Sequence, residues 1–150
     1  MSKQQWGNAT WYLFHTLAYK LKSEFTSDVR ILLDFVYTIC NNLPCPVCQA
    51  HAMKILSIVN KSRITSKETL VDFLWSFHNN VNKSLNLPIY TFEEMNTKYK
   101  LSSTVKIINY FIYTMKSAKY SHNLIGSFNR DSYITKFITY ISNNIHKYNA

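Results

Sequence analysis

The chain has 150 residues, of which 47% are hydrophobic and 15% aromatic, and this composition predicts one folded domain rather than a disordered chain. The formal net charge is +9, but the basic residues are scattered singly, which argues against a nucleic-acid site. Two glycines are too few for a phosphate-cradling glycine loop. No apolar run approaches the roughly 18 residues of a membrane span, and the first residues lack the features of a signal peptide. We therefore expect a cytoplasmic protein.

Apolar residues recur with a helical period from the first residues onward. A first helix is expected after a cap at Asn8, and a second after a cap at Ser27. The segment 41–44 ends with proline and breaks the pattern. A third helix is predicted from Cys45 to about Val59.

Two capping patterns mark the next helices. The segment 65–68 has the form of a capping box, which predicts a fourth helix that continues to about Leu85. Leu87 and Pro88 end this helix. Thr91 begins a similar pattern that predicts a short fifth helix.

The residues after about Leu101 form two further apolar-periodic stretches. These predict helices over 104–119 and 132–147, with a loop around Gly126 between them. No repeat or long linker separates this part from the rest. We expect one helical domain, over 1–100, with a C-terminal helical extension, over 101–150.

The most informative stretch is Cys45-Pro46-Val47-Cys48, followed at helical spacing by His51. If Cys45 is the N-cap and Pro46 the first helical residue, Cys48 falls in the first turn, where the helix dipole favours a thiolate. His51 then lies one turn later on the same face. This arrangement is typical of thiol redox chemistry.

Zinc binding is the alternative for these residues. Cys40, Cys45, Cys48 and His51 could supply a Cys₃His site in a non-enzymatic, zinc-stabilised interaction module. Cys40 also continues an apolar face, where a buried thiol is expected. We favour redox chemistry, because a ligand at Cys40 would require the loop to fold back on its helix. A thioredoxin fold would need strands around the pair, and no alternating pattern frames it.

Two other polar groups interrupt predicted helices. Trp11 and His15 lie four residues apart, and a polar run extends over 78–83. Each feature also has a structural interpretation when it is taken alone. Trp11 would then be a core residue, and His15 a buried, hydrogen-bonded structural residue. The polar run would be a solvent-exposed helix face. Their occurrence together with the cysteine pair is more specific than any one of them.

Three motifs occur in order, over 6–18, 43–52 and 78–85. Together they resemble the FAD-linked sulfhydryl oxidases of the Erv/ALR family. The Leu-Pro-Cys-Pro-x-Cys-x-x-His-Ala form is most similar to the versions encoded by large cytoplasmic DNA viruses. The resemblance covers about Trp6 to Tyr99 of the chain.

The resemblance implies an all-α fold, in which a four-helix bundle and a short fifth helix hold FAD at the mouth of the bundle. By motif position, the cofactor-binding residues implied are Trp11, His15, His51, His78, Asn79 and Asn82, with Lys83, Leu85 and Tyr99 as further candidates and Tyr19 near a family aromatic position. A homodimer is usual in this family. If the protein is viral, the compartment is the host cytoplasm or the virion.

The implied activity is oxidation of thiols in protein substrates by Cys45 and Cys48, with electrons passing to FAD and then to O2, which becomes hydrogen peroxide. Cys45 is expected to meet the substrate and Cys48 the flavin. The chain departs from many relatives in lacking a shuttle cysteine pair, and Phe92 stands where relatives tend to have cysteine. Substrates are therefore expected to reach Cys45 directly or through a separate dithiol carrier.

Overall fold

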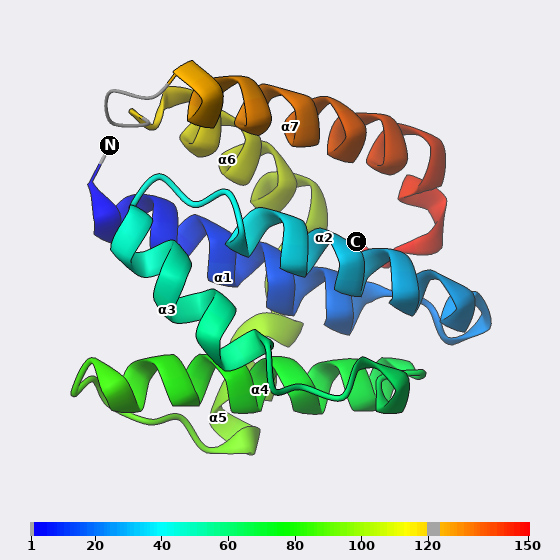
Figure 1. Cartoon of the computed structure of the whole chain (residues 1–150). Coiled ribbons are helices and arrows are strands. Elements are labelled where there is room, and N and C mark those ends of the chain that lie inside the picture. Colours follow the sequence, from blue (N-terminus) through cyan, green and yellow to red (C-terminus); the bar gives the residue numbers. More distant parts are fainter. Residues whose placement is uncertain (1, 120–123) are drawn as a thin grey trace.

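The computed structural model describes residues 2–119 and 124–150, whose regular secondary structure is helical apart from one isolated bridge between Leu21 and Tyr148 (Figure 1). The all-α prediction is confirmed. The α-helices are α1 (Lys3–Lys20), α2 (Val29–Cys40), α3 (Pro46–Leu56), α4 (Lys67–Ser84), α5 (Phe92–Lys100), α6 (Thr104–Ser117) and α7 (Leu124–Asn144). The short 3₁₀ helices are η1 (Ser23–Asp28), η2 (Lys61–Arg63) and η3 (Ile145–Lys147).

The starts of the first two helices differ from the prediction. Helix α1 begins at Lys3 because Ser2 and Gln5 form a reciprocal capping box, so Asn8 lies inside the helix. Ser27 belongs to η1, and Asp28 is the residue before α2. The Asp28 side chain makes no capping bond, because it is bound to the C-terminal part of the chain.

The predicted starts of α4 and α5 agree more closely with the structure. Thr91 and Glu94 form the predicted capping box of α5. The box of α4 lies one residue later than predicted: Ser66 is the cap, and its partner is Thr69 rather than Glu68. Threonine fills the role of the expected acid because its hydroxyl accepts from the Ser66 amide at 2.9 Å.

The extension contains two helices, as predicted, but the position of the second one is wrong. Helix α7 begins at Leu124 rather than near Ser132, so Gly126 lies within a helix and not in a loop. The first turns of α7 are exposed, with Leu124 at 89% and Phe128 at 73%. The buried face, which is what produces apolar periodicity, starts only at Tyr133.

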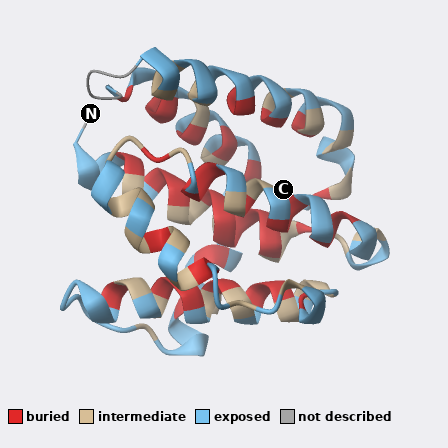
Figure 2. Ribbon diagram, in the orientation of Figure 1, coloured by how far each residue is buried: buried red, intermediate tan, exposed pale blue. Residues whose placement is uncertain are grey.

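Helix α1 lies at the centre of the molecule and contacts α2, α4, α5 and α6; in the view of Figure 1, α4 lies below α1 and α6 above it. Helix α7 packs over α6 and α2. Figure 2 shows that the buried residues of α6 and α7 face inward. Phe111 of α6 and Phe137 of α7 are fully buried in the cluster that also contains Leu33 and Leu74. The extension therefore shares its core with the N-terminal helices.

Polar contacts hold the C-terminus against the turn between α1 and α2. The buried carboxylate of Asp28 accepts from Lys147 Nζ at 3.1 Å and from the Tyr140 hydroxyl at 2.6 Å. Main-chain bonds join Lys22 N to the Lys147 carbonyl and Asn149 N to the Lys20 carbonyl, at 2.9 and 2.7 Å. None of the described helices is both long and apolar enough to cross a bilayer.

Candidate functional site

The cysteine pair lies at the start of α3, and the predicted local geometry is confirmed. Cys45 is the N-cap, and its Sγ accepts from the Cys48 amide at 3.2 Å. Pro46 occupies the start of the helix, where its fixed φ fits and its missing N–H costs nothing. Cys45 and Cys48 are joined as a disulfide. The free amides of the first turn and the positive end of the helix dipole are therefore directed toward this pair.

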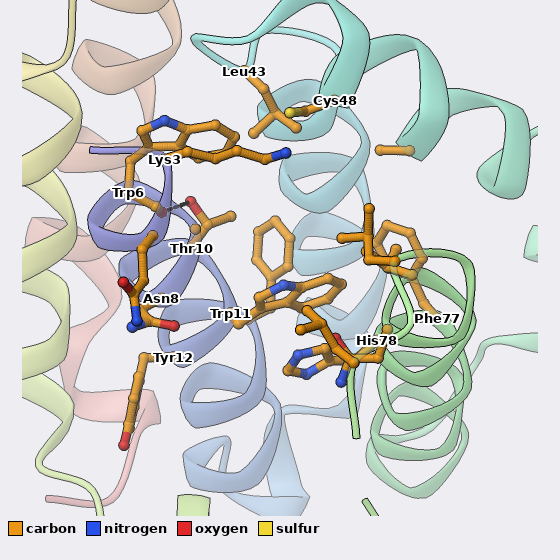
Figure 3. Close-up of a pocket in the computed structure, with 18 of the residues that line it drawn as sticks. Lys3, Trp6, Asn8, Thr10, Trp11, Tyr12, Leu43, Cys48, Phe77 and His78 are labelled. Atoms are coloured by element: carbon orange, nitrogen blue, oxygen red, sulfur yellow. Dashed lines mark hydrogen bonds between the residues drawn. The ribbon is translucent and has the colours of Figure 1, made fainter. Parts of the chain in front are cut away.

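A cavity of about 820 Å³ lies beside the disulfide, between α1, α3, α4, α5 and the loop that follows α4 (Figure 3). Cys48 lines this cavity, whereas Cys45 does not. Most of the lining is aromatic or aliphatic. Among the described lining residues, Lys3 and Lys98 carry positive charge and none is acidic. The cavity is therefore suited to a flat, apolar molecule that also carries negative charge.

A stack of rings forms one wall of the cavity. The indole of Trp11 lies flat on the imidazole of His78, with centroids 3.9 Å apart and planes 5° apart (Figure 3). Behind His78 lies His15, whose Nε2 is 2.9 Å from His78 Nδ1. His15 in turn stacks on Tyr99 at 4.3 Å. Helices α1, α4 and α5 thus all contribute rings to this wall.

Both imidazoles of this wall are neutral at pH 7. Burial lowers the pKa of His15 well below its ordinary value, and the neighbouring His78 and Lys98 lower it further. Burial and then Lys98 lower the pKa of His78 to about 4. With each ring carrying one proton, one can donate to the other across the 2.9 Å contact.

Two residues of the polar run of α4 form hydrogen bonds with the loop that follows this helix. The Asn79 side chain donates to the Tyr90 carbonyl at 2.8 Å and accepts from the Tyr90 amide at 3.0 Å. Asn82, which is buried, donates to the Pro88 carbonyl at 3.1 Å. The loop turns back at Asn86, whose φ is 57°. These bonds hold Leu87, Pro88 and Tyr90 against the cavity.

His51 connects α3 to α4 at the disulfide end of the cavity. It lies one turn after Cys48 and lines the cavity. Its Nε2 is 2.8 Å from the Ser84 hydroxyl, which also donates within its own helix. The imidazole is therefore held in one orientation beside the cysteine pair.

The structure brings together most of the site residues expected from the sequence. The cavity is lined by Trp11, Cys48, His51, His78, Asn82, Leu85 and Tyr99. Residues outside the lining are Cys45, His15, Tyr19, Asn79 and Lys83. His15 and Asn79 support lining residues through the contacts above.

The remaining two expected residues, Tyr19 and Lys83, have no such contact with the cavity wall. Lys83 is exposed on α4. Tyr19 is half-buried two turns beyond Trp11, and burial, followed by the charge of Asp72, raises its pKa to about 12.

Several lining residues were not singled out as site residues. They include Lys3, Tyr12, Phe77, Tyr90 and Lys98. Gly7 and Lys3 precede Trp11 at intervals of four residues, which places them on the same helix face. This spacing would have identified Lys3 as a candidate site residue. Tyr90 could not be found this way, because it reaches the cavity through the loop bonds of Asn79.

The zinc alternative finds no converging ligand set. Within residues 2–119 and 124–150, no group of three or more His, Cys, Asp or Glu side chains could hold a metal ion. Cys45 and Cys48 are bonded to each other, and Cys40 is a buried free thiol. Burial raises the pKa of Cys40, which keeps it protonated.

Comparison with known proteins identifies relatives of the chain. The model of the Erv1 / Alr family matches residues 8–100. The putative FAD-linked sulfhydryl oxidase 096R of Invertebrate iridescent virus 3 is 31% identical over 98 residues, which are 64% of this chain and 66% of that protein. The FAD-linked sulfhydryl oxidase ERV1 of Oryza sativa subsp. japonica is 31% identical over 100 residues, 66% of this chain and 51% of that protein.

A third relative is matched over more of its length. The FAD-linked sulfhydryl oxidase of African swine fever virus (isolate Pig/Kenya/KEN-50/1950) is 30% identical over 110 residues, 70% of this chain and 87% of that protein. The chain spans between half and two thirds of the iridescent virus and rice relatives. No solved structure matches the chain significantly.

Proposed function

This chain belongs to the Erv1 / Alr family, and we propose that it is an FAD-dependent thiol oxidase that forms disulfide bonds in protein substrates. The observation that carries the proposal is the asymmetry of the disulfide. Cys48 faces a large aromatic cavity, and Cys45 lies outside it. This asymmetry supports a division of roles in which the Cys45 sulfur exchanges with a substrate and the Cys48 sulfur exchanges electrons with a bound ring. The names of the viral and plant relatives support the same activity.

The residues of the cavity fit FAD. Its volume of about 820 Å³ lies within the range of cofactor sites, and its aromatic walls suit stacked rings. A dinucleotide also carries phosphates, which the lysines and the lack of lining carboxylates favour. The residues that would hold it are Trp11, His51, His78, Asn82, Leu85 and Tyr99. His15 would act by fixing His78, and Asn79 by fixing the loop at Tyr90.

The proposed reaction starts from the oxidised pair. A substrate thiolate attacks Sγ of Cys45, which breaks the Cys45–Cys48 bond and leaves Cys48 as a thiolate. A second substrate thiolate attacks the mixed disulfide, so that the substrate is released oxidised and the pair is left reduced. The N-terminus of α3 stabilises the Cys48 thiolate, and each pKa unit of such stabilisation is about 1.4 kcal/mol. Bound FAD would take the two electrons from the pair and pass them to O2, which becomes hydrogen peroxide.

The substrate reaches Cys45 directly or through a separate dithiol carrier. In this sequence Cys40 is the remaining cysteine, and it is buried, so no second pair relays electrons within it. We place the activity in the cytoplasm, or in a virion if the protein is viral, because two of the relatives are viral. The homodimer implied by the family stays a prediction, which a measurement of mass in solution tests.

Oxygen uptake with a small dithiol tests this function. The wild-type protein is expected to consume oxygen and to carry yellow flavin. Cys45→Ser and Cys48→Ser should each abolish turnover, because neither variant can form the disulfide. Activity that persists in both variants would reject the role of the pair. A colourless protein with stoichiometric zinc that unfolds on chelation would favour the interaction module instead.

A further inference from the structure

The first turns of helix α7 form an exposed apolar surface in the part of the chain that lies beyond the family match. Leu124 and Phe128 lie four residues apart on one face of this helix, and both are largely exposed (Figure 2). Arg130 anchors these turns to the end of α6, because its Nη1 donates to the carbonyls of Ala118 and Met115 at 2.8 and 3.4 Å. The apolar surface is therefore carried by a helix that is fixed to the rest of the protein.

The path of the chain brings this surface to the end of the molecule that carries the disulfide. Helix α6 begins beside the end of α1, where Thr16 Oγ1 is 2.8 Å from Ser102 Oγ. It runs back along α1, so its end, and with it the start of α7, lies toward the start of α1 (Figure 1). The start of α1 is near the disulfide, because Lys3 and Cys48 line the same cavity.

Another exposed apolar side chain lies within the cysteine pair itself. Val47 is 79% exposed and stands between Cys45 and Cys48 at the start of α3. A protein whose thiol attacks Cys45 covers the surface around that residue, and even transient protein contacts bury several hundred Å² on each partner. Such a contact is wider than the disulfide alone and includes neighbouring elements at this end of the molecule.

The segments that meet at this end contain basic residues and no acidic ones. The sequence has no Asp or Glu over 1–23, 35–67 and 95–130. Lys116 and Lys119, at the end of α6, are exposed, as is Lys3 at the start of α1. The next acidic residue, Asp131, pairs with Arg130 at 3.1 Å. Charge complementarity therefore favours an acidic partner, whereas a second copy of this chain would bring like charges together if it docked through the same face.

We propose that the start of α7 is a docking surface for the protein substrate of Cys45, and that it favours a substrate whose cysteines are flanked by apolar and acidic residues. The inference rests on the proposed function, since it assumes that a protein thiol exchanges with Cys45. Burial of an apolar side chain against Leu124 and Phe128 supplies affinity, and the lysines raise the rate of encounter. The C-terminal extension thus takes part in substrate recognition.

Oxidation of three synthetic peptides tests the proposal. Each carries the same Cys-x-x-Cys pair and has about 20 residues, which is long enough to extend from Cys45 over the start of α7. The reference peptide has Asp and Phe flanks; Lys replaces Asp in the second peptide, and Ser replaces Phe in the third. Measured by oxygen uptake at low salt, kcat/KM should be about tenfold lower for each altered peptide. Raised salt should reduce the difference between the Asp and Lys peptides.

Substitutions on α7 and α6 locate the docking surface. Phe128→Ser should lower kcat/KM about tenfold for the reference peptide but not for the Ser-flanked peptide, and should leave the oxidation of dithiothreitol unchanged. Ile58→Ser is the matched control, because Ile58 is also exposed but lies beyond the far end of α3. Lys116→Glu combined with Lys119→Glu should remove the preference for the acidic peptide. Lys106→Glu, at the other end of α6, should not.

Equal kcat/KM of the wild type and Phe128→Ser for the reference peptide would overturn the assignment. Binding of phosphatidylserine vesicles that Phe128→Ser abolishes, with peptide oxidation unchanged, would assign the surface to a membrane and overturn it as well. A dimer that Phe128→Ser dissociates, again with peptide oxidation unchanged, would assign it to a second copy of the chain. A wild-type protein that does not oxidise dithiothreitol would instead mean that the proposed function itself fails.

Discussion

His15 and His78 form a buried pair whose protonation the fold suppresses. Their rings share one hydrogen bond of 2.9 Å and lie between Trp11 and Tyr99. A second proton on either ring would place a positive charge in a site that already contains the field of Lys98. The neutral pair therefore keeps the aromatic wall of the cavity intact at pH 7.

This neutrality predicts a loss of stability in acid. The pKa of His78 falls from 6.5 to about 4 on folding, so between these values the unfolded chain binds more protons than the native one. The free energy of unfolding should thus decrease as pH falls from 6.5 toward 4, by up to roughly 3 kcal/mol from His78. Urea unfolding across this range measures it. The His78→Gln variant should show a flatter pH dependence; parallel curves for both proteins would contradict the prediction.

Individual residues of the site were predictable where one local rule governs them. The capping role of Cys45 and the position of Pro46 follow from backbone chemistry within four residues, and both were predicted correctly. The environment of His15 was not predictable in the same way. Its contact with His78 joins residues 63 positions apart, so only the packing of α1 against α4 places it behind the lining.

Polar side chains of helix α4 form hydrogen bonds with the loop that follows the helix. Asn79 makes two hydrogen bonds to the main chain of Tyr90, and the Trp75 indole donates to the same carbonyl at 3.0 Å. Because the loop contributes Leu87, Pro88 and Tyr90 to the cavity, these bonds determine the shape of one cavity wall.

Replacement of Asn79 by alanine should destabilise the protein by about 1–3 kcal/mol, because two hydrogen bonds to the loop are lost. Amide exchange of Tyr90, whose N–H bonds to Asn79, should become faster. Asn80→Ala provides the control, since Asn80 is the adjacent, exposed residue on the same helix. It is expected to change stability by no more than about 0.5 kcal/mol. Equal effects of the two variants would show that the loop is not held by Asn79.

Helix boundaries were predictable where a cap and its apolar face coincide. Helix α5 begins at the predicted capping box of Thr91 and Glu94. Helix α7 shows the opposite case, because its exposed first turns carry no core-facing pattern and its burial starts at Tyr133. A helix that extends beyond its buried face cannot be delimited by hydrophobic periodicity alone.

At the scale of the whole molecule, the extension is part of the same folded unit as the family region. The family match ends at residue 100, yet Phe111 and Phe137 are buried in the core that α1 and α2 form. Burial of a phenylalanine side chain contributes about 1.5–3 kcal/mol, so the two rings tie α6 and α7 firmly to the bundle. The sequence predicted that this segment is helical. It did not predict which surface the segment packs against, because an apolar stripe does not identify the surface that it covers.

The buried carboxylate of Asp28 fixes the end of the extension, and its removal should be costly. Asp28→Ala removes the ion-pair partner of Lys147 and one hydrogen-bond partner of the Tyr140 hydroxyl, and should destabilise the protein by about 3 kcal/mol. Asp34→Ala is a matched control, because Asp34 pairs with Arg30 at 3.6 Å on the exposed surface. It should cost less than about 1 kcal/mol. Thermal unfolding of both variants measures the difference, and a cost for Asp28→Ala as small as that for Asp34→Ala would contradict this role.

We propose that the Cys48 sulfur lies against bound FAD and delivers electrons to it. Anaerobic addition of a dithiol to the purified protein, followed by its visible absorption spectrum, tests this electron transfer. The yellow colour of the wild-type protein should bleach and return on exposure to air, whereas Cys48→Ser should bind flavin but stay yellow. Bleaching of Cys48→Ser at the wild-type rate, or a wild-type protein without flavin colour, would contradict it.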